Sequence, residues 1–207
     1  MFRDTLLHDF VRRIKLERQY RDWDRRGRPS RPAKTPYLVK LEAIREYAKR
    51  HGARVMVETG TFRGNMIVAQ RRHFDRIWSI ELDPALHAAA RERLARFRHV
   101  TLLRGDSATE IARVLADLRQ PALFWLDAHW SGGITARAEV DTPISAELEQ
   151  VLAHPVRDHV VLIDDAHEFV GENGYPTYDA LKAEVESLRP DLEMELRDNI
   201  IRITPRA

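Results

Sequence analysis

The chain has 207 residues, 43% hydrophobic and 32% charged, a composition typical of one soluble domain with a buried core. Its 34 Lys and Arg residues nearly balance 32 Asp and Glu residues, which gives no strong attraction to nucleic acid, and the absence of cysteine excludes disulfides and cysteine-ligated zinc. No apolar run approaches the ~20 residues of a membrane helix, and no secretory signal begins the chain, so we expect a cytoplasmic protein without membrane contact.

The first 35 residues differ in pattern from the rest. Apolar residues recur at helical spacing from Phe2 to Ile14, which predicts a short amphipathic helix. The basic run 25–32 contains prolines and a glycine that interrupt helices and strands, so it predicts an exposed linker. We therefore expect an arm, residues 1–35, followed by one ligand-binding domain, residues 36–207. Such an arm suits docking on a second copy in a homodimer, and nucleic-acid binding through it is the less favoured alternative.

From Tyr37 onward, helical and strand patterns alternate. Helices are predicted near residues 38–48, 65–70, 83–96, 108–118, 144–152 and 181–188, and strands near 55–57, 77–80, 100–103, 122–126, 160–163, 193–196 and 200–204. This alternation predicts an α/β fold with a doubly wound, mostly parallel seven-stranded sheet and a C-terminal antiparallel hairpin.

A strand, a glycine turn and a helix follow one another at residues 55–70. The strand ends at Glu58, the turn contains Gly60 and Gly64, and a second strand ends about 20 residues later at Glu81. This order is typical of a nucleotide pocket, in which an acid at the place of Glu81 accepts hydrogen bonds from a ribose. A tight connection without a ligand is the alternative for the glycines alone.

The glycine spacing distinguishes between nucleotide ligands. Phe62 stands where a dinucleotide fingerprint has its middle glycine, and no phosphate-binding G-x-x-x-x-G-K-[ST] loop occurs, which argues against ATP or GTP hydrolysis. An acid beside the turn, Glu58, would repel a pyrophosphate but suits a cationic amino-acid group. The pattern therefore favours S-adenosylmethionine over NAD.

Carboxylates follow the later strands as well, where ligands bind in such sheets. Asp106 and Ser107 suit recognition of an adenine amino group. His129, two residues after Asp127, is a candidate general base, or it packs or caps its loop. Asp164 and Asp165, with Asp127, are candidate ligands of Mg²⁺ or Ca²⁺, although an arginine partner or a backbone cap also fits them.

With these residues the chain resembles the class I S-adenosylmethionine-dependent methyltransferases over roughly residues 37–206. Within that class it looks closest to the macrocin O-methyltransferase-like group, whose Ile-Asp-Asp it matches at 163–165, whereas Leu126–Trp130 departs from the usual Asp-Gly-Asp of the group. The Asn-Pro-Pro-aromatic motif of amino-directed nucleic-acid methyltransferases is absent. The resemblance implies a Rossmann-like fold, and these cofactor-binding residues: Glu58, Thr59, Gly60, Thr61, Gly64, Glu81, Asp106, Ser107 and Asp127.

The activity we expect is methyl transfer from S-adenosylmethionine to an oxygen of a small molecule, of sugar or natural-product type. His129 and Asp127 are the catalytic candidates, or a Mg²⁺ ion held by the three aspartates lowers the pKa of the acceptor hydroxyl. Two alternatives remain at this stage. One is a non-catalytic protein that binds an adenosine ligand, and the other is a nucleic-acid methyltransferase anchored by its basic arm.

Overall fold

The centre of the fold is one seven-stranded sheet, in a computed structural model that describes residues 2–29, 34–127 and 143–206. The strands are β1 (Val55–Thr59), β2 (Arg76–Glu81), β3 (Val100–Arg104), β4 (Ala122–Leu126), β5 (Val160–Ile163), β6 (Leu192–Arg197) and β7 (Ile200–Pro205). They are ordered β3-β2-β1-β4-β5-β7-β6. β1 to β5 run parallel, and β7 is antiparallel to β5 and β6. The predicted doubly wound sheet with a terminal hairpin is therefore confirmed.

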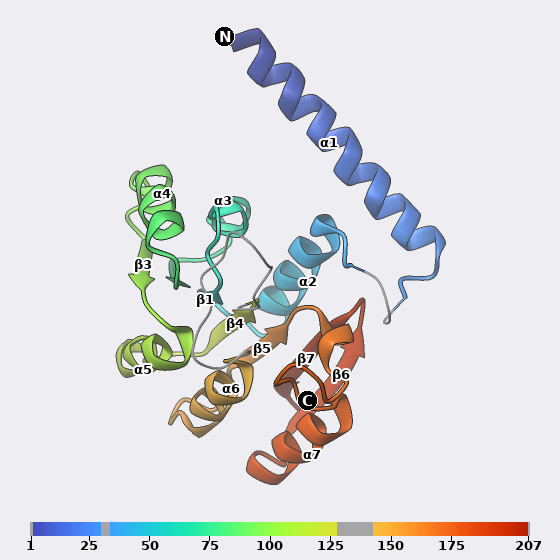
Figure 1. Cartoon of the computed structure of the whole chain (residues 1–207). Helices are drawn as coiled ribbons and strands as arrows, with labels where there is room; N and C mark the ends of the chain where they lie inside the picture. Colours follow the sequence, from blue (N-terminus) through green and yellow to red (C-terminus); the bar gives the residue numbers. More distant parts are fainter. Residues whose placement is uncertain (1, 30–33, 128–142, 207) are drawn as a thin grey trace.

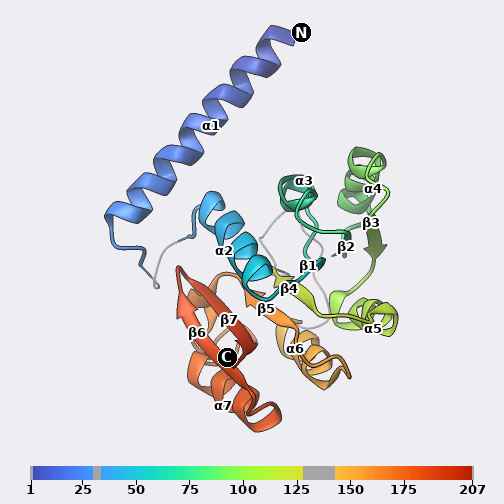
Figure 2. The same cartoon turned by 180° about the vertical axis from the view of Figure 1, so that it is seen from behind.

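Helices cover both faces of this sheet, as Figures 1 and 2 show from opposite sides. They are α2 (Tyr37–Arg50), α3 (Asn65–Gln70), α4 (Pro84–Leu94), α5 (Ser107–Asp117), α6 (Ile144–Ala153) and α7 (Tyr178–Leu188). Because strand side chains alternate between faces, Met56 packs in the core under α2, α3 and α4, and Val57 packs under α5, α6 and α7. All residues of β1, β4 and β5 are buried, as expected for the middle of a parallel sheet.

The first helix after β2 shows how closely local sequence signals match the structure. Asp83 caps the N-terminus of α4, because its Oδ1 accepts the backbone N–H groups of Ala85 and Leu86, each at 2.8 Å. Pro84 occupies the first helical position, where the missing N–H is not needed. The helix predicted near residues 83–96 is therefore confirmed.

The register of the sheet aligns the ends of its strands. Leu126 of β4 is paired with Thr59 of β1 and with Ile163 of β5. Asp127 and Asp164 follow these paired residues directly, and the backbone N–H of Asp164 donates to the carbonyl oxygen of Leu126 at 3.0 Å. Acids that are far apart in the sequence therefore meet at one edge of the sheet.

The N-terminal helix is longer than predicted. α1 (Phe2–Arg25) continues well past Ile14 and extends away from the sheet in both views. Residues 15–25 contain no glycine or proline, and opposite charges four residues apart stabilise the helix, as in the pair of Arg13 with Glu17 at 2.9 Å. The helix ends just before Gly27, which adopts a φ of 74°.

The start of the predicted basic linker is held to the domain. Arg28 forms an ion pair with Glu42 at 2.7 Å and approaches Asp198 at 3.6 Å. The indole Nε1 of Trp23, a side chain with no exposed surface, donates to Asp198 Oδ1 at 3.3 Å. Within the predicted exposed linker, Arg28 is only partly exposed, with 30% of its side-chain surface accessible, because Asp198 in the β6–β7 turn offers it a buried carboxylate that the local sequence does not reveal.

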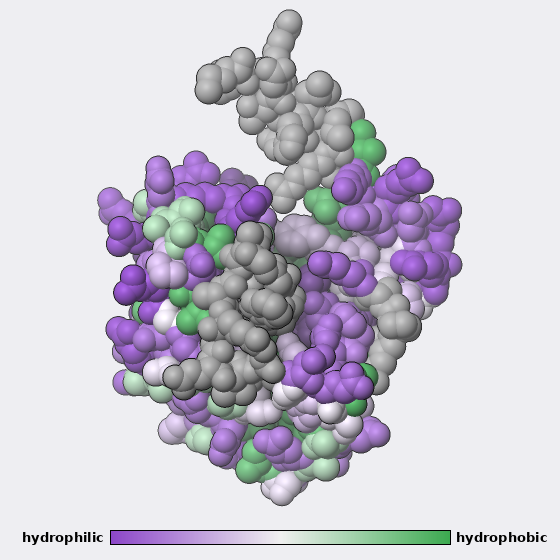
Figure 3. Space-filling model, in the orientation of Figure 1, coloured by the Kyte–Doolittle hydropathy of each residue, from purple (hydrophilic) through white to green (hydrophobic). Residues whose placement is uncertain are grey.

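The visible surface of the described residues is mainly hydrophilic, with small separate apolar areas (Figure 3). Among the described residues, no helix combines the length and the apolar character needed to cross a membrane.

Candidate functional site

The turn after β1 depends on two glycines. Gly60 and Gly64 adopt φ values of 83° and 67°, which side chains disfavour. A Cβ atom at Gly64 would lie 2.9 Å from Leu94 Cδ1, so this position also needs the close approach of α4. The N–H groups of Gly60 and Thr61 both donate to the carbonyl oxygen of Ile80, at 3.0 and 3.1 Å. The turn is therefore fixed to the end of β2.

Glu81, the last residue of β2, strengthens this connection. Its Oε2 accepts the backbone N–H of Phe62 at 2.7 Å, and its Oε1 accepts the N–H of Asp83 at 2.9 Å. The residue is only 6% exposed. Each carboxylate oxygen keeps a second lone pair after these bonds, so the geometry allows it to accept further hydrogen bonds from a diol. The glycine turn and the predicted ribose acid form one hydrogen-bonded unit.

Glu58 lies at the end of β1 on the inner side of the same turn. Ser79 Oγ donates to its Oε2 at 2.6 Å, and the residue is 2% exposed. Burial, followed by the nearby carboxylates of Asp127 and Glu81, raises the pKa of Glu58 to about 8. In this environment an incoming cation would be a favourable partner for the ionised form.

A second polar group links β1 to the loop after β3. Glu147 of α6 is completely buried, accepts a hydrogen bond from Ser107, and lies 3.4 Å from Thr59 Oγ1 through its Oε2. Burial raises the pKa of Glu147 to about 7. Among the described residues, its Oε1 has no hydrogen-bond partner. The side chain of Thr59, predicted to bind cofactor, is therefore engaged with Glu147 inside the protein.

Sequence analysis did not identify Glu147, although one signal was available. Ile144, Leu148 and Val151 form the buried face of α6, and Glu147 lies on that face at helical spacing. An acid on the apolar face of a helix must find a buried polar partner. Next to it, Asp106 accepts a bond of 3.3 Å from Thr109 and is partly exposed.

Three predicted metal ligands come together after β4 and β5. Asp127, Asp164 and Asp165 each offer a carboxylate oxygen, and these atoms lie within 4.8 Å of one another. Asp165 reaches this place from a left-handed backbone conformation with a φ of 50°. Oxygen donors of this kind and number suit Mg²⁺ or Ca²⁺.

A lysine that sequence analysis missed already contacts this cluster. Lys40 of α2 donates to Asp164 Oδ2, and its side chain is 11% exposed. Burial acts to lower the pKa of Lys40, but the carboxylates of Asp164, Asp127 and Asp165 outweigh it and raise that pKa. One ammonium shared among three acids does not neutralise them, and burial raises the pKa of Asp164 to about 7. Ile44 and Tyr47 follow Lys40 at helical spacing, so its place on the buried face of α2 was a readable signal.

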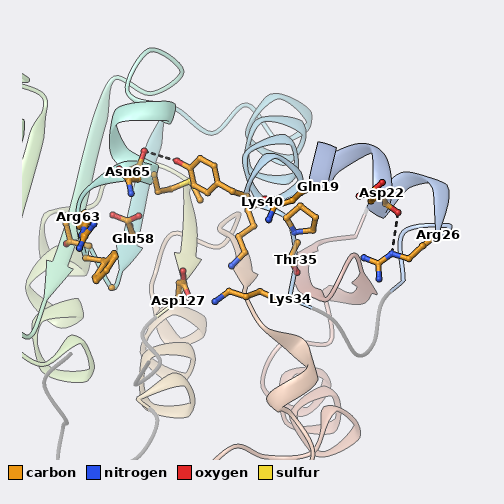
Figure 4. A pocket seen from close by; sticks show the side chains of 16 residues that line it. Gln19, Asp22, Arg26, Lys34, Thr35, Lys40, Glu58, Arg63, Asn65 and Asp127 are labelled. Carbon is orange, nitrogen blue, oxygen red and sulfur yellow. Dashed lines mark hydrogen bonds between the residues drawn. The ribbon is translucent and has the colours of Figure 1, made fainter. Parts of the chain in front are cut away.

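A pocket of about 550 Å³ opens between the glycine turn and the N-terminal segment (Figure 4). One wall consists of residues at the strand ends and in the turn: Glu58, Gly60, Thr61, Phe62, Arg63, Asn65, Met66 and Asp127. The other wall comes from the start of α2 and the end of α1: Lys34, Thr35, Pro36, Tyr37, Lys40, Gln19, Asp22 and Arg26. The pocket is thus shared between the arm and four predicted cofactor residues, Glu58, Gly60, Thr61 and Asp127, whereas Thr59, Gly64, Glu81, Asp106 and Ser107 do not line it.

His129 is the candidate general base, and His167 is a second histidine close to the predicted metal ligands. His129 lies outside the described residues, so its role stays a prediction. His167, which follows the Asp-Asp pair, donates its backbone N–H to Asn199 Oδ1 at 2.8 Å, and its Nε2 lies 3.1 Å from Glu168 Oε1. His167 is therefore engaged at the β7 side of the sheet and does not line the pocket described above.

Comparison with known proteins identifies the fold. The sequence matches no protein-family model and no curated protein. An O-methyltransferase from Bacillus cereus in complex with S-adenosylhomocysteine is similar in structure, with a TM-score of 0.60 and 15% identity over 92% of this chain and 90% of that one. TomG, an O-methyltransferase of tomaymycin synthesis from Streptomyces achromogenes, is similar with a TM-score of 0.59 and 17% identity. The match covers 93% of this chain and 88% of TomG. The 23S rRNA methyltransferase ErmE is similar with a TM-score of 0.53 and 18% identity, over 84% of this chain and 70% of ErmE.

The chain therefore has the Rossmann-like fold of S-adenosylmethionine-dependent methyltransferases. Identities this low show the fold alone, and this fold serves acceptors as different as a small molecule and ribosomal RNA. The finer resemblance to the macrocin O-methyltransferase-like group stays a prediction.

Proposed function

We propose that this protein transfers the methyl group of S-adenosylmethionine to an oxygen nucleophile of a small molecule. The observation that carries this proposal is the hydrogen-bonded unit of Glu81 and the Gly60–Gly64 turn at adjacent strand ends, next to a pocket of about 550 Å³ that Glu58, Gly60 and Thr61 line. Its acids suit a ribose and an ammonium, and they disfavour a pyrophosphate.

Each part of the cofactor has a matching group in the chain. Glu81 accepts the ribose hydroxyls, and Glu58 receives the amino group of the methionine part. Asp106 and Ser107 recognise the adenine amino group, while Glu147 orients Ser107 from within the protein. The cofactor supplies a sulfonium, from which the methyl group leaves readily, so the protein mainly has to align the acceptor and remove its proton.

The acceptor enters from the side of the pocket formed by the arm. Lys34, Tyr37 and Arg26 line that side, opposite the turn that holds the cofactor. Asp127, at the boundary between the two sides, and His129 are the proposed proton acceptors. The arm would dock on a second copy in a homodimer, whereas assistance by Mg²⁺ would require an ion at three acids of which Lys40 already contacts one.

The cofactor part of the proposal is tested by calorimetric titration with S-adenosylhomocysteine, beside NAD and ATP. We expect binding of S-adenosylhomocysteine only, weakened at least tenfold by Glu81→Ala. Asp75→Ala is the matched control, because Asp75 is an exposed acid near the opposite end of β2, paired with Arg54 at 2.6 Å. Preference for NAD, or no binding at all, would refute the proposal.

The reaction is tested by a screen of hydroxyl acceptors with radiolabelled S-adenosylmethionine. His129→Ala should lose turnover and keep its affinity for S-adenosylhomocysteine. Binding without turnover on any acceptor would favour the non-catalytic alternative. Turnover on RNA that falls steeply with salt and disappears on deletion of residues 1–34 would favour the nucleic-acid alternative.

A further inference from the structure

Lys40 and Asp164 form a buried ion pair between distant parts of the chain. Lys40 belongs to α2 and Asp164 follows β5, so 124 residues separate them. The side chain of Lys40 is 11% exposed and that of Asp164 is 1% exposed. Figure 4 shows the ammonium of Lys40 directed toward the strand end that carries Asp127. Such a pair is held by the fold and is little screened by solvent.

The ammonium and a divalent ion would compete for the same carboxylate cluster, in which Lys40 contacts Asp164 Oδ2 and Asp164 Oδ1 has no hydrogen-bond partner among the described residues. Asp164 Oδ2, the atom that accepts from Lys40, belongs to a cluster whose three carboxylates lie within 4.8 Å of one another. A divalent ion binds carboxylate oxygens at 2.0–2.6 Å. An ion bound to all three acids would therefore lie within a few ångströms of the lysine nitrogen, where the two positive charges repel each other strongly in a water-poor site.

We propose that Lys40 is the resident cation of the Asp127–Asp164–Asp165 cluster and that it prevents tight binding of a divalent metal ion there. The lysine is part of the chain, so its local concentration does not depend on the solution, whereas a metal ion must first displace it. Displacement would also leave the ammonium to find a new partner near a buried site, which is unfavourable. This inference concerns which cation the cluster holds, and it goes beyond the proposed methyl transfer.

The ion pair has a second consequence for the pocket. Lys40 follows Lys34–Tyr37, the segment that forms one wall, and Asp164 follows the strand next to Asp127 on the other wall. A cation supplied by α2 therefore joins the two walls, which a free metal ion held only by strand-end acids would not do.

The test is direct measurement of Mn²⁺ binding, by calorimetry and by electron paramagnetic resonance of free Mn²⁺. We expect the wild-type protein to bind Mn²⁺ weakly, with a Kd no tighter than about 1 mM, far from the 10⁻⁷–10⁻⁵ M of sensor sites for Ca²⁺. Lys40→Met and Lys40→Gln should bind at least tenfold more tightly, and adding Asp164→Asn should abolish this gain. Lys40→Arg keeps the charge and should show no gain.

Lys49→Met is the matched control, since Lys49 lies exposed on the same helix. The inference is overturned if wild-type protein binds Mn²⁺ with micromolar affinity, or if folded Lys40→Met binds it no better than wild type. Should the Lys40 variants fail to fold, as judged by circular dichroism, the wild-type titration still decides the question. None of these measurements requires methyl transfer, so failure of the proposed function leaves them interpretable.

Discussion

Ser79 Oγ donates a hydrogen bond of 2.6 Å to Glu58 Oε2, and Ser79 Oγ also lies 2.5 Å from Thr61 Oγ1. A short line of hydroxyl groups therefore connects the acid to the glycine turn. Neither hydroxyl carries a charge, so burial dominates and raises the pKa of Glu58 to about 8. Near neutral pH, Glu58 is mostly protonated before any ligand binds.

Binding of S-adenosylhomocysteine should release a proton at pH 7. If Glu58 receives the amino group of the ligand, the bound state favours the ionised carboxylate, whereas the free protein is protonated below about pH 8. Affinity should therefore rise up to tenfold from pH 7 to pH 8 and then level off. Calorimetry in two buffers of different ionisation enthalpy measures the proton directly. Glu58→Gln should bind more weakly and show neither effect, and a pH-independent wild-type affinity would contradict the assignment.

Glu147 should make the protein less stable as pH rises. Its pKa of about 7 in the folded state lies above the ordinary glutamate value of 4.5, so the folded state holds more protons between these values. The contribution of Glu147 to the unfolding free energy should decrease across that window by at most about 3 kcal/mol and stay level above it. Urea unfolding of wild type and Glu147→Gln at pH 5 and pH 8 checks this, because the variant should lose that decrease. An equal pH dependence in both proteins would argue against a buried ionisation at Glu147.

His159 should contribute the opposite trend over nearly the same pH range, so each contribution is measured as a difference between wild type and variant. Burial, with the nearby His154 and Arg189, lowers the pKa of His159 to about 4, and its Nδ1 accepts the N–H of Ala122 at 3.1 Å. The unfolded chain takes up a proton near pH 6.5, so stability should fall as pH decreases from about 6.5 to 4, by at most about 3 kcal/mol. Differences in urea unfolding between wild type and His159→Gln measure it. His73→Gln, at an exposed position, should keep the wild-type profile.

Gly64 and Gly52 form a matched pair for the glycine turn. Both have positive φ, 67° and 63°, but a Cβ atom meets Leu94 only at Gly64. Gly52→Ala should therefore cost about 1–2 kcal/mol from the backbone conformation. Gly64→Ala should cost about 1–3 kcal/mol more through the forced contact, and it should also weaken binding of S-adenosylhomocysteine. Equal losses of stability in thermal unfolding would mean that α4 moves freely away from the turn.

Asp198 should be a large contributor to stability although it lies in a hairpin turn. It is 2% exposed, accepts from Trp23 and approaches Arg202 at 3.3 Å, a side chain that is 1% exposed. Asp198→Asn removes the charge and leaves Arg202 buried without it, so unfolding free energy should drop by about 3 kcal/mol. Asparagine tolerates the φ of 56° that Asp198 adopts, so the substitution adds no backbone strain to the measured loss of stability. Asp75→Asn, in an exposed pair, should change stability little.

The elements that sequence predicts well are those whose signals are local. The buried strands are continuous apolar runs in the sequence. The Gly60–Gly64 turn and Glu81 predicted which edge of the sheet carries the ligand site. Because parallel strands all end at that edge, the meeting of Asp127, Asp164 and Asp165 also followed from the sequence. These predictions needed only periodicity and the geometry of parallel sheets.

The residues that sequence analysis missed act through tertiary contacts. Lys40 and Glu147 are ordinary charged residues on helices until packing brings them to Asp164 and Thr59. Arg28 lies in a basic run that predicts solvent exposure, but its partners Glu42 and Asp198 are 14 and 170 residues away in the sequence. No local pattern encodes such separations, although charged residues on the buried faces of α2 and α6 mark where to look.

The ion pair of Arg28 with Asp198 and the bond from Trp23 to the same acid also determine when the pocket is completed. Trp23 and Asp198 are 175 residues apart, so the arm finds its place only after the final hairpin has formed. During synthesis, the parallel core can assemble while α1 is still unattached, because Asp198 follows β1 to β5 in the chain. The part of the pocket wall that α1 supplies is therefore attached after the parallel core, and a chain truncated before β6 would lack the anchor that holds α1 over the pocket.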